Sequence, residues 1–231
     1  MYPPERIPLP EYPEDDLDDC VNKYSKKNHE AFTPEKMREA IAAYYACVSF
    51  MDAQAGRVLT ALEDSGRAEN TIVVVWGDHG FHLGEHMLWQ KYTAFEESCR
   101  VPLLIRAPGV TPQSVWCSRP VECLDLFPTL TDLCGLGVPE NIEGVSMKEL
   151  LATPEMPWKK AALTEMPNVI SLRSEQFRYV RSRSDPSREE LYDHERDPRE
   201  IHNVARDMEY DYVLAEMRGY AEGGWKSRLP G

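Results

Sequence analysis

The run Thr71-Ile72-Val73-Val74-Val75-Trp76 leads directly into Gly77-Asp78-His79-Gly80. Its β-branched, apolar part predicts a strand buried on both faces, as in a parallel sheet covered by helices. Polar side chains follow at the carboxyl end of this strand, which is where open α/β sheets bind their ligands. A carboxylate beside an imidazole, between glycines that allow a sharp turn, is a credible half of a metal site. Asp78 and His79 are therefore candidate ligands of a metal ion whose other ligands lie elsewhere.

Two other interpretations of these polar residues stay open. Asp-His-Gly alone is equally well explained as a turn in which the aspartate hydrogen-bonds its own backbone. His79, His82 and His86 also invite comparison with a zinc-binding helix. Gly80 and Gly84 make a continuous helix unfavourable there. We therefore expect His82 and His86 to make structural hydrogen bonds rather than to bind a metal.

A long helix is predicted before the strand. Thr33-Pro34-Glu35 provides an N-cap, a proline in the first turn and an early acid. Asp52 is expected to be a partly exposed acid on this helix. Apolar residues recur with the three-four spacing of a buried stripe at Met37, Ile41, Tyr44, Val48, Met51, Ala55, Val58 and Leu62.

Further elements follow the strand. Val101–Ile105 predicts a second strand, and Thr93-Ala94-Phe95-Glu96 has capping-box form for a short helix between the two strands. Asp125 begins another helix, which stops at Gly135. This order of elements predicts an α/β fold, with part of a mostly parallel sheet flanked by helices.

Composition and residue pattern divide the chain into three parts. Residues 1–32, rich in proline and acids, predict an extended connecting segment without a core of its own. Residues 33–152 carry the α/β elements. Residues 153–231 begin with a linker and continue as short alternating segments, which predict a small α+β subdomain with an antiparallel sheet and a closing helix near 207–221.

Composition limits the function classes. A net charge of −13 argues against nucleic acid and anionic membranes as main partners. No apolar run is long enough to span a bilayer, so no membrane span is expected. The six cysteines show no metal-binding spacing, and several lie in apolar runs, as Cys47 and Cys134 do. Buried thiols are favoured for them, and a Cys117–Cys123 disulfide is the alternative for one pair.

The stretch around Asp78 resembles the second signature of type I sulfatases, of the alkaline-phosphatase-like superfamily, and most closely their iduronate-2-sulfatase-like branch. The matching elements are Asp78-His79-Gly80, Leu83-Gly84-Glu85-His86 and Trp89-Gln90-Lys91. Flanking segments agree in order, among them Tyr44-Tyr45-Ala46, Arg100-Val101-Pro102-Leu103, Asp125-Leu126-Phe127-Pro128-Thr129-Leu130 and Leu191-Tyr192-Asp193. The resemblance covers nearly the whole chain, and it makes residues 33–152 the carboxyl-terminal part of a sulfatase α/β domain.

The resemblance implies roles for three residues. Asp78 and His79 would bind the active-site Ca²⁺. Lys91 would be catalytic and substrate-binding, because it would contact the sulfate group and the bridging oxygen, on which charge grows as the S–O bond breaks. Calcium prefers oxygen ligands, so His79 could orient the sulfate instead of binding the metal.

No cysteine of this sequence provides the nucleophile of such enzymes. Type I sulfatases use a formylglycine made from Cys or Ser in a Cys/Ser-x-Pro/Ala-x-Arg sequence, and none of the six cysteines fits. Cys117-Ser118-Arg119-Pro120 has similar residues in the wrong order. We therefore expect this chain to be a carboxyl-terminal fragment, inactive alone, whose partner is the missing amino-terminal sulfatase segment.

Two alternatives compete with a sulfatase. Asp-His-Gly after a strand also occurs in zinc or manganese phosphodiesterases of the same superfamily. A degenerate, non-catalytic binding module is the second alternative. The expected substrate is a sulfate ester, by resemblance that of a sulfated carbohydrate, and Glu165-Met166-Pro167-Asn168 is a candidate lining of its pocket. The sequence does not determine the compartment, although full-length relatives are usually exported.

Overall fold

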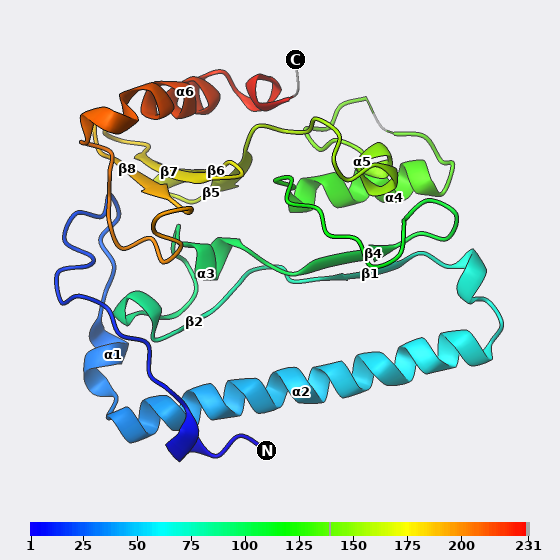
Figure 1. The fold of residues 1–231 in the computed structure, drawn as a ribbon, viewed down its shortest axis with the longest axis horizontal. Coiled ribbons are helices and arrows are strands. Elements are labelled where there is room, and N and C mark those ends of the chain that lie inside the picture. The colour runs from blue at the N-terminus through cyan, green and yellow to red at the C-terminus, as the bar shows by residue number, and fades with distance from the viewer. Residues whose placement is uncertain (139, 230–231) are drawn as a thin grey trace.

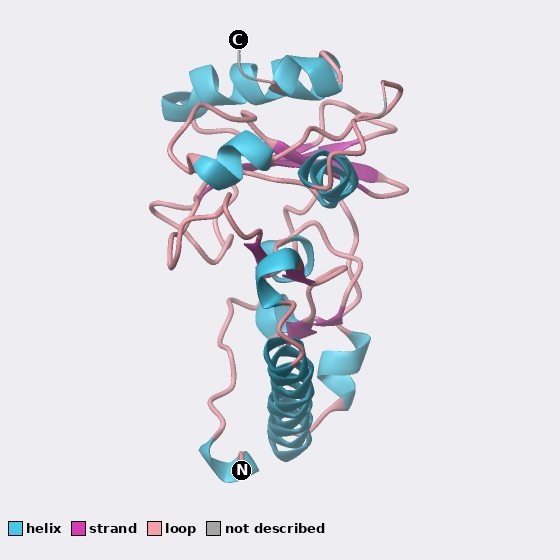
Figure 2. Ribbon diagram, turned by 90° about the vertical axis from the view of Figure 1, so that its right-hand side faces the viewer, coloured by secondary structure: helices cyan, strands magenta, loops and turns pink. Residues whose placement is uncertain are grey.

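The computed structural model describes residues 1–138 and 140–229. Figure 1 shows the long helix α2 (Pro34–Asp64) along one side of the molecule and α6 (Asp211–Glu222) along the opposite side, with the strands between them. Figure 2, turned by 90°, views α2 nearly end-on and shows the same layers. The candidate site residues lie in the middle layer, after the first strand.

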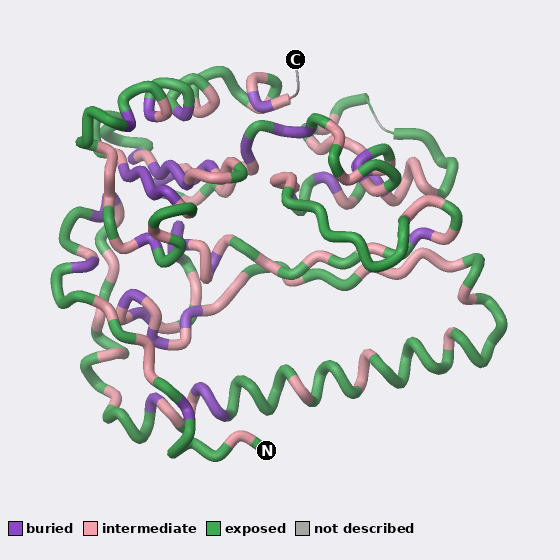
Figure 3. Tube along the Cα trace, viewed as in Figure 1, coloured by how far each residue is buried: buried purple, intermediate pink, exposed green. Residues whose placement is uncertain are grey.

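Helix α2 begins as predicted but is buried over only its first part. The Thr33 side chain accepts a hydrogen bond from the backbone N–H of Lys36, which caps the helix. Its buried residues are Met37, Ile41 and Ala42. The predicted buried stripe is therefore wrong beyond Ala42: Val48, Met51 and Val58 are 48%, 54% and 69% exposed, and Figure 3 shows most of the helix as exposed. Asp52 is exposed, as expected.

Strand β1 (Val73–Trp76) pairs with β4 (Leu103–Arg106) in antiparallel fashion, with Val73 opposite Arg106. The predicted parallel pairing is wrong for these two strands. The connection between them contains a small hairpin and the four-residue helix α3 (Glu96–Cys99) instead of a crossover helix. Burial on both faces is also wrong, because Trp76 is 54% exposed.

Two further helices follow β4. Helix α4 (Leu126–Leu133) begins one residue after the predicted start, because Asp125 belongs to the 3₁₀ turn that precedes it. Asp125 is buried and accepts hydrogen bonds from the buried Lys159 ammonium at 2.7 and 2.9 Å. Helix α5 spans Lys148–Ala152. The buried ion pair therefore fixes the start of α4 against the segment that leads into the last sheet.

The carboxyl-terminal part is an antiparallel sheet covered by a helix, as predicted. Its strands are β5 (Ala162–Glu165), β6 (Val169–Arg173), β7 (Phe177–Ser182) and β8 (Glu189–Asp193), hydrogen-bonded in that order. Leu172, Tyr179 and Leu191 point from this sheet into a core completed by Leu214 and Met217 of α6. Successive side chains of a strand point to opposite faces of the sheet, so these three lie on one apolar face, and α6 packs on that face.

Residues 1–32 contain a 3₁₀ turn at Pro4–Arg6 and the one-turn helix α1 (Lys27–Ala31), and the rest is an irregular strap. Within this strap Cys20 packs near Tyr192, and Val21 packs with Val180 of the last sheet. The segment thus takes part in the cores of other elements. The division into three parts at residues 32 and 152 stays a prediction.

The cysteines differ from expectation. Cys20 is buried, but Cys47 and Cys134 are exposed, and all six are free, including Cys117 and Cys123. Cys47 is exposed because it lies on the uncovered part of α2. Within the described residues, none of the helices combines the length and apolar character that crossing a membrane requires.

Candidate active site

The three residues singled out from the sequence lie together at the end of β1. Nε2 of His79 lies 2.6 Å from the Lys91 ammonium and 3.5 Å from Oδ2 of Asp78. The Asp78 side chain is 84% exposed and that of His79 38% exposed, so both remain accessible to a ligand. An acid, an imidazole and an ammonium therefore converge on one point of the surface.

The hydrogen bonds of His79 determine its tautomer. Nδ1 is 2.9 Å from the carbonyl oxygen of Gly80, which can only accept, so Nδ1 carries the proton. The ammonium of Lys91 can only donate, so Nε2 presents its lone pair. This is the tautomer that a metal-binding histidine needs, with one ring nitrogen oriented by a carbonyl and the other free to bind a cation.

Lys91 is held in place by a small hairpin with an unusual backbone. Strands β2 (His82–Leu83) and β3 (Trp89–Gln90) pair with His82 opposite Gln90. Gln90 and Tyr92, on either side of Lys91, both have positive φ, at 78° and 76°. Non-glycine residues adopt this conformation at an energetic cost, and such residues cluster at functional sites. The hairpin thus directs Lys91 toward His79, and it leaves the Tyr92 side chain exposed beside it.

Gly80 allows the loop to approach α3 closely. A Cβ atom on this residue would lie 1.8 Å from the carbonyl oxygen of Glu97. The backbone N–H of Gly80 donates to the carbonyl of Ser98 at 2.9 Å. Only glycine can make this contact without moving the loop that carries Asp78 and His79.

The other two histidines of the stretch are buried and hydrogen-bonded, as expected. Nε2 of His82 is 2.7 Å from the Thr93 hydroxyl, and burial, followed by the nearby His86, lowers the pKa of His82 to about 4. Nδ1 of His86 is 2.9 Å from Oδ2 of Asp16, and its Nε2 is 3.6 Å from Oε2 of Glu97. His86 therefore ties the amino-terminal strap and α3 to the hairpin of Lys91.

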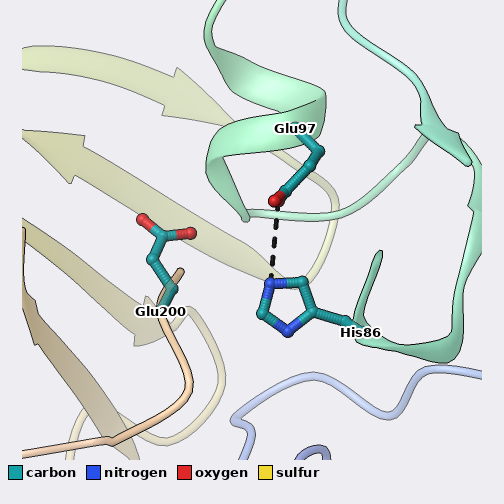
Figure 4. Close-up of side chains that lie close together, drawn as sticks. All are labelled: His86, Glu97 and Glu200. Atoms are coloured by element: carbon teal, nitrogen blue, oxygen red, sulfur yellow. Dashed lines mark ion pairs between the residues drawn. The ribbon is translucent and has the colours of Figure 1, made fainter. Parts of the chain in front are cut away.

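A buried ionic network lies behind this hairpin. His86, Glu97 and Glu200 have atoms able to bind a metal within 4.8 Å of one another. Figure 4 shows these three side chains and the ion pair between His86 and Glu97. Glu200 is already engaged, because it accepts hydrogen bonds from Arg178, from His194 and from the backbone N–H of Glu96. Burial would raise the pKa of Glu200, but Arg178 and His194 lower it to about 2. We interpret the cluster as a structural ion network.

Sequence reasoning did not find this network. Glu97 and Glu200 lie far apart in the chain and carry no local motif. Each residue taken alone resembles an ordinary surface charge, because only the tertiary fold brings the two carboxylates to the same histidine. The capping-box form of Thr93 to Glu96 was misleading in detail, since α3 begins at Glu96 and Thr93 instead pairs with His82.

The chemistry of the candidate site can be compared with that of a metal centre. One carboxylate and one imidazole with a free lone pair are suitable donors for a divalent cation. Two donors do not complete the coordination of Ca²⁺, which takes six to eight oxygen ligands. Asp78 and His79 therefore fit a partial site, and further oxygen ligands have to come from outside this group.

Comparison with known proteins identifies the family. The model of the family "Sulfatase" matches residues 17–136, and the model "N-sulphoglucosamine sulphohydrolase, C-terminal" matches residues 84–222. A sulfatase of Formosa agariphila is 34% identical over 227 residues, covering 94% of this chain and 44% of that protein. A Delta 4,5-hexuronate-2-O-sulfatase of Bacteroides thetaiotaomicron is 32% identical over 244 residues, covering 91% of this chain and 49% of that protein.

Structural similarity extends to hydrolases of a related kind. The phosphonate monoester hydrolase of Silicibacter pomeroyi matches with a TM-score of 0.82 at 26% identity, over 99% of this chain and 52% of that one. This confirms the α/β fold class predicted from the sequence, although β1 and β4 are antiparallel to each other. The chain spans about half the length of the relatives it matches. Sequence motifs, family models and fold agree, and the chain belongs to the type I sulfatase family of hydrolases.

Proposed function

We propose that this chain contributes half of the active site of a sulfuric ester hydrolase. In this proposal Asp78 and His79 bind a divalent cation, and Lys91 binds the sulfate group of the substrate. The observation that carries the proposal is the convergence of the three side chains, with Lys91 Nζ 2.6 Å and Asp78 Oδ2 3.5 Å from His79 Nε2. The strained residues Gln90 and Tyr92 flank Lys91 and hold it against an imidazole, and residues with such a backbone cluster at functional sites.

The metal in this proposal is Ca²⁺, which would neutralise the negative oxygens of the sulfate group. Asp78 provides the charged ligand. His79 provides either a ligand through the lone pair of Nε2 or, with a proton on Nε2, a hydrogen bond to a sulfate oxygen. Both uses require Lys91 to give up its present hydrogen bond to His79. A ligand at the site would thus turn the ammonium toward the substrate.

Lys91 is proposed to stabilise the leaving group. As the S–O bond breaks, negative charge develops on the bridging oxygen, and a nearby ammonium stabilises that charge more in the transition state than in the ground state. Lys91 is half-buried and its ammonium lies beside the exposed Asp78, so a substrate can reach it from outside. Because a relative acts on a hexuronate 2-O-sulfate by its name, we propose a sulfated carbohydrate as the substrate class.

The nucleophile and the remaining metal ligands are proposed to come from an amino-terminal sulfatase segment that carries the formylglycine sequence. These 231 residues alone should therefore not turn over a sulfate ester. The test compares the chain with a chimera in which the amino-terminal part of the Formosa agariphila relative precedes it. We expect hydrolysis of 4-nitrophenyl sulfate by the chimera, loss of this activity with EDTA and no hydrolysis by the chain alone. Hydrolysis by the chain alone would refute the half-site.

Phosphonate ester hydrolysis is a second candidate, favoured by the TM-score of 0.82 to a phosphonate monoester hydrolase. The same chimera decides between the two, because it can be assayed with 4-nitrophenyl sulfate and with 4-nitrophenyl phenylphosphonate. A higher kcat/KM for the sulfate supports the sulfatase. A higher kcat/KM for the phosphonate, with zinc or manganese in the purified protein, supports the second candidate.

A further inference from the structure

Two buried polar atoms in the ion network behind the hairpin have no hydrogen-bond partner among the described residues. They are Nε2 of His86 and Oε2 of Glu97. The side chain of His86 is fully buried, and that of Glu97 is 23% exposed. Buried polar groups of native proteins are almost always paired, because a buried ring nitrogen or carboxylate without a partner costs free energy. These two atoms need an explanation that the hydrogen bonds of the network do not supply.

The hydrogen bond between His86 and Asp16 leaves a lone pair on Nε2 of His86. Nδ1 lies 2.9 Å from Oδ2 of Asp16, and an ionised carboxylate can only accept, so Nδ1 carries the proton. In the neutral ring Nε2 then presents its lone pair to the carboxylate of Glu97, which it faces in Figure 4. Two electron-rich atoms are stable side by side in a buried place only when a proton or a metal ion lies between them. The structural hydrogen bond that the sequence predicts for His86 thus uses one ring nitrogen and leaves the other available.

The distance between the two atoms favours a metal ion over a proton. Nε2 of His86 and Oε2 of Glu97 are 3.6 Å apart, whereas an N–H···O hydrogen bond joins atoms at about 2.7–3.2 Å. Two ligands of one tetrahedral zinc ion lie about 3.3 Å apart, because each is bound at about 2.0–2.2 Å. The pair therefore has nearly the separation of two ligands on one ion.

Glu200 provides a third ligand atom, within 4.8 Å of the other two. Its Oε1 accepts hydrogen bonds from Arg178 and His194. Among the described residues its Oε2 accepts from the backbone N–H of Glu96 alone. A carboxylate oxygen with a single hydrogen bond keeps a lone pair for a cation. Glu200 can therefore close the site while it retains its ionic contacts.

Asp16 and Phe95 hold the ring of His86 in the orientation that such a site requires. A metal-binding histidine almost always donates its other ring N–H to a carboxylate, a carbonyl or water, as His86 does to Asp16. Phe95 stacks on the imidazole with ring centroids 3.8 Å apart and planes 11° from parallel. The ring cannot turn without losing both contacts, so Nε2 stays directed toward Glu97.

We propose that His86, Glu97 and Glu200 bind a structural Zn²⁺ ion, which completes the ion network behind the hairpin. Zinc suits one imidazole and two carboxylates, whereas calcium prefers a shell of oxygen ligands. This inference goes beyond the proposed function, because the ion would be buried and would touch no substrate. It would join the turn after β2 to α3 and to the segment that follows β8. The hairpin that carries Lys91 would thereby be fixed from behind.

The test measures zinc bound to the 231-residue chain after equilibration with ZnCl₂ and gel filtration. We expect one retained ion whose X-ray absorption spectrum shows nitrogen and oxygen ligands at about 2.0–2.2 Å, a measurement that needs no variant. The same ion should remain in His79→Gln, because that change removes the imidazole of the candidate active site and leaves the buried site intact. Retention in this variant separates the two sites.

Glu97→Gln keeps the size of the side chain but removes its charge, and it should weaken zinc binding at least about tenfold. Glu195→Gln is the matched control at an exposed position and should leave zinc affinity within about twofold. Zinc should raise the midpoint of thermal unfolding of the unmodified chain and of Glu195→Gln but not that of Glu97→Gln. Circular dichroism of the two variants shows whether both are folded.

Several outcomes would overturn the proposal. One is a chain that retains no zinc, and another is an equal loss of zinc in Glu97→Gln and Glu195→Gln. Zinc that His79→Gln removes and Glu97→Gln retains would belong to the candidate active site. A proton on Nε2 of His86 in the zinc-treated chain, detected by ¹⁵N NMR of the ring, would show an imidazolium ion between Asp16 and Glu97 instead. None of these measurements uses sulfate ester hydrolysis, so a failure of the proposed function leaves the zinc site untouched.

Discussion

Lys91 donates a hydrogen bond to Nε2 of His79 across 2.6 Å, although the two residues lie twelve positions apart on different segments of the hairpin loop. The contact links the end of β1 to β3. It means that the position of the ammonium depends on the fold of the whole 82–92 segment.

The first prediction concerns the charge of Lys91. In the chimera described above, Lys91→Met keeps a side chain of similar length but removes the ammonium, so kcat for 4-nitrophenyl sulfate should fall by about 10²- to 10³-fold. Lys36→Met is the matched control, because Lys36 is an exposed lysine that pairs with the exposed Glu39. Equal activity of the two variants would show that Lys91 does not act in the reaction.

The second prediction concerns the close approach at Gly80. Gly80→Ala should destabilise the protein by about 3 kcal/mol, because the new Cβ would lie 1.8 Å from the Glu97 carbonyl oxygen. Gly56→Ala is the control, since that position lies inside α2 with no atom within 4 Å of the new Cβ, and it should stabilise by about 0.5–1 kcal/mol. Urea unfolding of both variants measures the difference. A neutral Gly80→Ala would mean that the loop moves away from α3 freely.

The third prediction concerns pH. Burial lowers the pKa of His82 to about 4 from its ordinary value of 6.5. Between these values the unfolded chain binds a proton that the folded chain does not, so the free energy of unfolding falls as pH drops from about 6.5 to about 4. The shift corresponds to about 3 kcal/mol at most.

Urea titrations at pH 7, 5.5 and 4.5 would measure this dependence. His82→Gln keeps a hydrogen-bonding side chain near Thr93 without the titrating ring. It should therefore have a smaller slope of stability against pH than the unmodified chain. The same slope in both proteins would assign the pH dependence to other groups.

The fourth prediction concerns the buried network. Glu200→Gln removes the charge that Arg178 and His194 face, and breaking a buried pair in this way typically costs about 3–5 kcal/mol. Glu39→Gln removes the partner of Lys36 in an exposed pair and should cost less than about 0.5 kcal/mol. Thermal unfolding compares the two. Similar small losses would show that the network contributes little to stability.

Local patterns in the sequence were sufficient for the elements with strong signals. The cap at Thr33, the strand 73–76 and the last three strands of the final sheet formed where propensity and spacing predicted them, whereas β5 was not predicted. Motif order was also sufficient to predict that Asp78, His79 and Lys91 lie close together, while their roles in a site stay a prediction. Each of these features depends on residues close in the chain or on a motif short enough to be recognised.

Local sequence patterns did not determine which residues of α2 are buried or in which direction β1 and β4 run relative to each other. The apolar spacing of α2 shows which side of the helix would be packed, but whether anything packs there depends on segments far away or outside these residues. The antiparallel pairing of β1 with β4 depends on the path of the connection between them. A β-branched run fits a parallel or an antiparallel neighbour equally well.

The sequence by itself determined the family, the order of the elements and three candidate site residues, because these depend on local patterns and motifs. Only the tertiary structure decided that Lys91 reaches His79, that His86 joins Asp16 to Glu97, and that the α2 stripe is left uncovered. The physical reason is that contacts between distant residues depend on the sum of many packing interactions, and no single stretch of sequence contains that sum.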